Sequence, residues 1–120
     1  GAQKVLILFD FDEKFVPESA RQGFILLAEL LEKNPNLKFE IIGFTDSKGH
    51  EEYNRKLSES RANAILTYLV KLGLEKERFT TSGSGEKNPL APNKNPDGSY
   101  NAEGMKLNRR VEIGLSNMKF

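Results

Sequence analysis

The spacing of the apolar residues changes repeatedly along this chain, and that change constrains the fold more than any other feature. Val5 to Phe9 form a short apolar run, which is typical of a buried strand. Apolar residues then recur at steps of three or four from Val16 to Leu31, which indicates one face of a helix. The chain therefore begins with a strand followed by a helix.

The same two patterns alternate over the rest of the chain. The further predicted elements are a strand at 37–41, a helix at 51–72 that ends at Gly73, a strand at 78–82 and a strand at 111–115. The segment from Gly83 to Gly104 is rich in glycine and proline, so we expect an irregular chain ordered only by brief turns.

This order of elements predicts the fold class. We expect an α+β fold, a βαβαβ-β two-layer sandwich in which a four-stranded mixed sheet carries two main helices on one face. The length of 120 residues is usual for one domain, so residues 1–120 are expected to form a single domain. The first residues do not have the pattern of a secretory leader.

Composition excludes several classes of function. The net charge of +1 gives no overall field that would attract nucleic acid, and no apolar run approaches the roughly 20 residues that span a bilayer. The chain has no cysteine, and its single histidine, His50, has no second histidine with which to bind zinc. Asp10, Asp12 and Glu13 match no calcium-binding loop. We therefore expect no metal and no cofactor.

Arg61 interrupts the apolar face of the second predicted helix. It lies four residues from both Leu57 and Ile65, which belong to that face. A guanidinium removed from water needs a carboxylate or several other acceptors, because an uncompensated buried charge is strongly destabilising. We expect an anionic group opposite Arg61.

Asp46 and Asn54 are candidates to share a groove with Arg61. Asn54 lies two helical turns before Arg61, and Asp46 lies in the loop that leads into the helix. Together these side chains could bind a zwitterion, with Asp46 holding an ammonium and Arg61 a carboxylate. The alternative is an internal salt bridge between Asp46 and Arg61, and the spacing alone does not distinguish the two.

The residues around these three resemble the signature of a known family, the OmpA-like C-terminal domain, which includes OmpA, the Pal lipoprotein and MotB. The matching motifs are Gly43-Phe44-Thr45-Asp46-Ser47-Lys48-Gly49 and Tyr53-Asn54-x-x-Leu57-Ser58-x-x-Arg61-Ala62. Shorter matches at Phe9-Asp10-Phe11-Asp12, Gly83-x-Gly85-Glu86-x-x-Pro89 and Asn108-Arg109-Arg110-Val111-Glu112 extend the resemblance over nearly the whole chain.

Members of that family hold peptidoglycan through the diaminopimelate of its stem peptide. The resemblance therefore implies a fragment of a longer exported protein, located in the periplasm and associated with the outer membrane through the rest of its parent. It implies that Asp46 and Arg61 bind the charged ends of diaminopimelate. The other implied contacts are Asn54 and Thr45 as hydrogen-bonding groups, Phe11 and Asp12 as one wall, Leu57 beneath the ligand and Arg109 at the rim.

Two other classes of function remain to be compared with this one. A periplasmic protein-interaction domain could bind a partner peptide in the same groove. A glycosidase would need a carboxyl group with a raised pKa, but Arg61 would lower the pKa of a neighbouring acid, so we expect no catalysis. The segment 92–101 is longer than in many family members and resembles Bacteroidetes versions, so the resemblance implies no role for it.

Overall fold

The computed structural model describes residues 4–116, so residues 1–3, on which the expectation about a leader partly rests, lie outside the described part. The elements are β1 (Val5–Leu8), α1 (Arg21–Glu32), β2 (Phe39–Gly43), α2 (Glu51–Lys71), β3 (Phe79–Gly83), α3 (Ala102–Asn108) and β4 (Arg110–Leu115). Short 3-10 turns, Glu18–Ala20 and Lys76–Arg78, precede α1 and β3.

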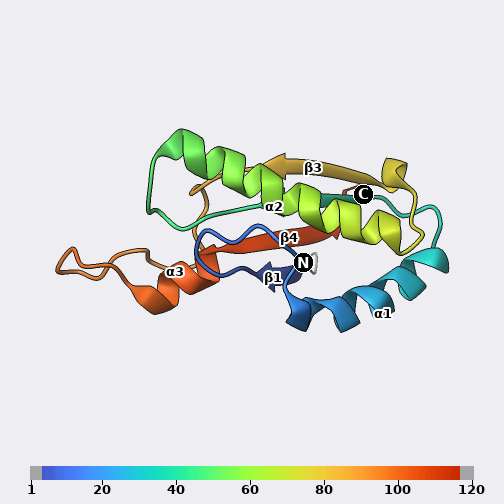
Figure 1. Cartoon of the computed structure of the whole chain (residues 1–120), viewed down its shortest axis with the longest axis horizontal. Coiled ribbons are helices and arrows are strands. Elements are labelled where there is room, and N and C mark those ends of the chain that lie inside the picture. Colours follow the sequence, from blue (N-terminus) through green and yellow to red (C-terminus); the bar gives the residue numbers. More distant parts are fainter. Residues whose placement is uncertain (1–3, 117–120) are drawn as a thin grey trace.

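The strands form one mixed sheet in the order β1-β4-β2-β3. Strand β4 pairs antiparallel with both β1 and β2, whereas β2 and β3 are parallel. Helices α1 and α2 lie on the same side of this sheet (Figure 1). The predicted α+β sandwich with two main helices on one face is confirmed. No helix of residues 4–116 is both long enough and apolar enough to cross a membrane.

The core lies between the two main helices and the sheet. Helix α1 contributes Phe24 and Leu31, and α2 contributes Ile65 and Leu69, all of them buried. Each side chain of this size contributes about 1.5–3 kcal/mol when fully buried. The apolar spacing that predicted the helices therefore also identified the faces that hold the two layers together.

Helix α2 lies very close to the ends of β2 and β3. A Cβ atom added to Gly43 would lie 1.9 Å from the backbone oxygen of Ser58, and one added to Gly83 would lie 2.5 Å from the backbone nitrogen of Glu59. Only glycine permits this approach. It places the first half of α2 against the loop that follows β2, where the predicted site residues are found.

The opposite face of the sheet carries a buried ion pair on β4. The Arg110 Nε atom donates to the Glu112 carboxylate at 2.8 Å, and the Arg110 guanidinium lies 3.8 Å from the ring centroid of Phe44. Both charged residues are less than a tenth exposed. The pair therefore occupies the middle of the sheet on the side that α1 and α2 leave uncovered.

The expectation that 83–104 would be irregular is wrong in its last part, because α3 begins at Ala102. The helix has only seven residues and contains Gly104, so it is too short and too broken to produce a visible apolar period. It is instead fixed by its surroundings. The Asn101 side chain caps its first turn by accepting from the Gly104 amide at 3.0 Å.

Candidate functional site

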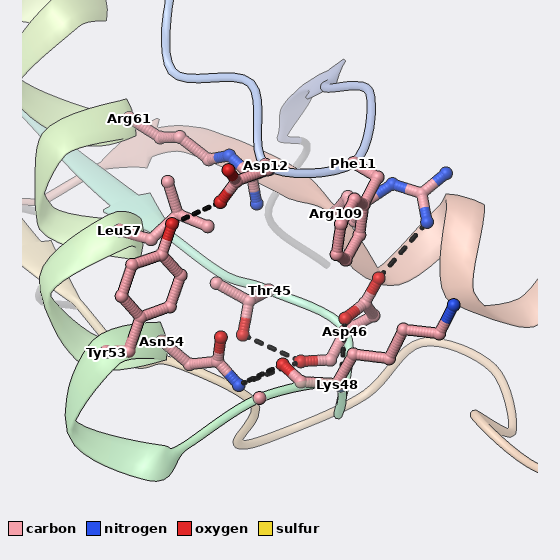
Figure 2. A pocket seen from close by; sticks show the side chains of 11 residues that line it. Phe11, Asp12, Thr45, Asp46, Lys48, Tyr53, Asn54, Leu57, Arg61 and Arg109 are labelled. Atoms are coloured by element: carbon pink, nitrogen blue, oxygen red, sulfur yellow. Dashed lines mark hydrogen bonds and ion pairs between the residues drawn. The ribbon is translucent and has the colours of Figure 1, made fainter.

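A small cavity lies between the first half of α2 and the loop that follows β2 (Figure 2). Its volume is about 70 Å³. Its lining includes all eight side chains expected from the sequence, together with three others. They are Phe11, Asp12, Thr45, Asp46, Lys48, Gly49, Tyr53, Asn54, Leu57, Arg61 and Arg109.

Asp46 is almost completely buried and is held by the protein on two sides. Its Oδ2 atom lies 3.1 Å from Nη1 of Arg109, and its Oδ1 atom accepts from the Lys48 amide at 3.0 Å. The alternative of an internal salt bridge with Arg61 is therefore wrong, because the partner is Arg109. A carboxylate has about four acceptor positions, so Asp46 can still accept from a ligand.

Arg61 is fully buried and does not face an anionic group in direct contact. Its three nitrogens donate to the backbone oxygens of Glu13 at 2.7 Å and of Phe44 and Asp10 at 3.1 Å each. The expected anionic partner is replaced by these three carbonyl dipoles. Burial lowers the pKa of the Arg61 guanidinium to about 10, and the charge of Asp46 offsets part of this effect. Arg61 is therefore still a cation at neutral pH.

Arg109 is the more accessible of the two guanidiniums. Its side chain is 16% exposed, compared with none of Arg61. Its Nε atom donates to the backbone oxygen of Phe9 at 3.1 Å, and this bond fixes the plane of the guanidinium group beside Asp46. Arg109 thus lies at the edge of the cavity, where it can reach both Asp46 and a ligand.

Thr45 and Asn54 shape the loop that carries Asp46. The Thr45 hydroxyl donates to the Asp46 backbone oxygen at 2.8 Å, and the Asn54 amide nitrogen donates to the Lys48 backbone oxygen at 2.9 Å. The oxygen of the Asn54 side chain points away from the Lys48 backbone oxygen that its nitrogen binds (Figure 2). Asn54 therefore offers one acceptor on the cavity side while its nitrogen holds the loop in place.

Tyr53 and Lys48 line the cavity but were not identified from the sequence. The Tyr53 hydroxyl donates to the Asp12 carboxylate across the cavity, above Leu57 (Figure 2). This hydrogen bond raises the pKa of Tyr53. The Lys48 ammonium lies 5.4 Å from the ring centroid of Phe11. Both residues lie inside the quoted motifs, so the available signal was their position next to Asn54 and Asp46.

Residues 4–116 contain no cluster of three histidine, cysteine, aspartate or glutamate side chains that could hold an ion. His50 precedes α2 and is exposed.

Comparison with known families matches residues 8–103 to the OmpA family. The chain is 45% identical over 107 residues to photosystem I P700 chlorophyll a apoprotein A2 of Gloeobacter violaceus, covering 89% of this chain and 12% of that protein. It is 43% identical over 110 residues to outer membrane protein A of Bordetella avium, covering 89% and 52%. It is 39% identical over 87 residues to the peptidoglycan-binding protein ArfA of Mycobacterium tuberculosis, covering 72% and 25%.

The chain therefore spans between 12% and 52% of the length of these relatives. Among solved structures, it is similar to the peptidoglycan-associated lipoprotein of Burkholderia pseudomallei, with a TM-score of 0.84 and 26% identity. That match covers 92% of this chain and 89% of the solved chain, so the likeness extends over the whole sandwich.

Proposed function

Because the chain belongs to the OmpA family, we propose that it binds peptidoglycan without catalysis, by holding the free amino and carboxyl groups of diaminopimelate in the cavity beside α2. Two relatives, a peptidoglycan-binding protein and a peptidoglycan-associated lipoprotein, support this choice of polymer by their names. The proposal places the domain in the periplasm, associated with the outer membrane through the rest of its parent protein.

The lack of a carboxylate in direct contact with the Arg61 guanidinium is the observation that carries the proposal. Among residues 4–116, no carboxylate forms an ion pair with this guanidinium, which is fully buried and adjoins the cavity. A guanidinium has five N–H donors, and three nitrogens already donate one bond each to carbonyl oxygens, so two donors remain. A ligand carboxylate satisfies both the charge and the donors, with Arg109 as a second cation at the rim.

The ammonium group of the ligand belongs at Asp46. This carboxylate is buried in the cavity wall and has spare acceptor capacity beside its bonds to Arg109 and Lys48. The oxygen of Asn54 provides a second acceptor for the same ammonium. Thr45 holds the loop, while Phe11, Asp12 and Leu57 form the walls. Diaminopimelate within a stem peptide offers such a free amino and carboxyl pair on one flexible arm.

The lining of the cavity favours a head group with charges of both signs, because it contains the Asp46 carboxylate together with the guanidiniums of Arg61 and Arg109. Two charge-assisted bonds of about 1.5–3 kcal/mol each sum to about 3–6 kcal/mol, which corresponds to a Kd between several millimolar and roughly tens of micromolar at one site. Because the cell wall carries many stems, several copies of the parent protein or repeated rebinding would convert this weak affinity into retention.

The test is sedimentation with insoluble peptidoglycan. Asp46→Asn keeps the shape of the side chain but removes its charge, so we expect at least a tenfold loss of the sedimented fraction. Glu40→Gln, an exposed change on β2 with the same charge difference, serves as the matched control and should sediment like the wild type. Circular dichroism checks that both variants remain folded.

Competition separates the proposal from a protein-interaction function. Free diaminopimelate should release the wild-type protein from peptidoglycan. A folded Asp46→Asn variant that sediments like the wild type contradicts the site, and release by an acidic peptide but not by diaminopimelate favours a partner protein instead.

A further inference from the structure

The segment 92–101, for which the sequence implied no role, forms an ordered hairpin. Lys94 and Tyr100 make an antiparallel bridge, and the Asn95 amide donates to the Ser99 backbone oxygen at 2.8 Å. The turn is closed by the Gly98 amide, which donates to the Asn95 oxygen at 2.9 Å. We call this segment the 92–101 hairpin. It projects beyond the end of the sheet together with α3 (Figure 1).

The base of the hairpin is fixed to the rest of the fold by Asn108, which is fully buried. The Asn108 side-chain oxygen accepts from the Leu90 and Ala91 amides at 2.7 and 3.1 Å. Its nitrogen donates to the Asn93 side chain at 2.9 Å. The hairpin therefore presents its outer side chains in a defined position, although those side chains are not part of the core.

The Tyr100 ring lies within cation–π distance of two lysines, Lys48 and Lys94. Its side chain is half-exposed, and its ring centroid lies 4.8 Å from the Lys48 ammonium and 5.6 Å from the Lys94 ammonium. Lys48 also lines the cavity, so these three residues continue directly from it. We call Lys48, Lys94 and Tyr100 the lysine–tyrosine shelf.

The shelf is positively charged and has no internal counter-ion. Within residues 4–116, neither Lys48 nor Lys94 forms an ion pair with a carboxylate. The cation–π contacts hold both ammonium groups around one ring, although like charges repel. An anion that binds to either ammonium group relieves this repulsion. Because ammonium groups already lie over the ring, the shelf suits a carboxylate better than a stacked sugar.

We propose that the lysine–tyrosine shelf is a second subsite, which holds a carboxylate of the stem peptide other than that of the diaminopimelate head group. This inference rests on the proposed function, because the head group in the cavity is what brings the rest of the stem to Lys48. Two groups of the stem have the required chemistry: its C-terminal carboxylate and the free carboxylate of its glutamate residue.

The experiment measures calorimetric affinities for three synthetic stem peptides. One has both carboxylates free, one has a C-terminal amide, and one has the glutamate carboxylate amidated. The wild-type protein should bind the free peptide about three- to tenfold more tightly than one of the two amides, as expected for two exposed ion pairs. The amide that binds more weakly identifies the carboxylate on the shelf. High salt should reduce this discrimination.

Two double variants with equal changes in net charge test the residues. Lys48→Gln with Lys94→Gln should bind all three peptides with equal affinity. Lys71→Gln with Lys76→Gln, exposed changes at the other end of α2, should discriminate like the wild type.

The outcomes separate this inference from the proposed function. If the wild type does not discriminate, or if the Lys48 and Lys94 double variant still does, the shelf is not a subsite, while the cavity proposal stands provided that Asp46→Asn abolishes binding. If the wild type binds none of the peptides, or if Asp46→Asn binds them normally, the proposed function fails and the shelf inference fails with it.

Discussion

Replacing Arg61 by alanine should destabilise the domain as well as weaken peptidoglycan binding. The substitution leaves the backbone oxygens of Glu13 and Phe44 without their donor, whereas that of Asp10 still accepts from the Glu13 amide at 3.0 Å. An unsatisfied buried acceptor costs about 1–3 kcal/mol. Two effects make the total loss of stability smaller than the sum of these costs. Water can enter the space that the side chain leaves and donate to the carbonyl oxygens. The variant also no longer buries a cation, and the lowering of the Arg61 pKa to about 10 shows that this burial is unfavourable. We therefore expect a net loss of about 3 kcal/mol, against the roughly 5–15 kcal/mol typical of a whole domain.

Urea unfolding followed by circular dichroism measures this loss. If both proteins unfold in two states, the slope of the unfolding free energy against urea concentration should be the same for the variant and the wild type. At about 4 °C per kcal/mol for a domain of this size, the melting temperature should fall by about 12 °C. Arg55→Ala is the matched control on the same helix. Arg55 is about half-exposed and pairs with Glu52 and Glu59 at the surface, so its loss should cost less than about 1 kcal/mol.

Arg61→Lys distinguishes the charge from the geometry of the guanidinium. Lysine keeps the positive charge but replaces the planar fork by a single ammonium, so it cannot reach three separate carbonyl oxygens in the same way. We expect a stability between those of the wild type and Arg61→Ala. Equal stabilities of Arg61→Ala and Arg55→Ala would refute the reasoning, because they would mean that the three carbonyl contacts contribute nothing.

Two further predictions concern stability. Gly104→Ala places a Cβ atom 1.8 Å from a backbone oxygen of the hairpin, so we expect it to destabilise the domain by about 1–3 kcal/mol. Gly23→Ala adds its Cβ atom in open space on α1, so we expect it to stabilise the domain by about 0.5–1 kcal/mol. Thermal unfolding of both variants measures these changes. Burial opposes ionisation of Glu112, but hydrogen bonds and charges, those of Arg110 first, hold its pKa below 4.5. The stability that ionised Glu112 contributes is present above that pH and is lost as the pH falls through the folded-state pKa. When the free energy of unfolding is measured at decreasing pH, it should therefore fall less steeply for Glu112→Gln than for the wild type or for the control Glu40→Gln.

The fold could be predicted because its information is local. Both main helices and the strands β2 and β4 display periods that specify which faces are buried. The apolar run of β1 has no such period, and the expectation of a buried strand there is wrong in part, because β1 lies at the edge of the sheet and Val5, Leu6 and Leu8 are exposed. The 92–101 hairpin and α3 lack such a period. They depend on two asparagine side chains: that of Asn101 accepts from the Gly104 amide, and that of Asn108 accepts from the Leu90 amide. A single sequence does not distinguish such asparagines from those of an ordinary loop.

The members of the site could be identified more readily than their pairing. The break in the apolar face pointed to Arg61, and its spacing pointed to Asn54 and Asp46. The carboxylate of Asp46 nevertheless pairs with Arg109, which lies 63 residues away in the sequence. Which of two guanidiniums reaches an acid depends on how β4 leaves α3, and no local pattern records that geometry.

The junction between α3 and β4 carries three consecutive side chains, of which Asn108 holds the hairpin and Arg109 holds the cavity. Asn108 fixes the hairpin, Arg109 pairs with Asp46, and Arg110 lies against the ring of Phe44 on the far face of the sheet. Successive side chains diverge in this way because the backbone changes at Arg109 from helix to strand, where neighbouring residues point to opposite faces. A disturbance at this junction therefore moves both binding regions together, whereas Asp46 and Lys94 each belong to only one of them. Substitutions at those two residues, rather than at the junction, are what can assign a loss of binding to the cavity or to the shelf.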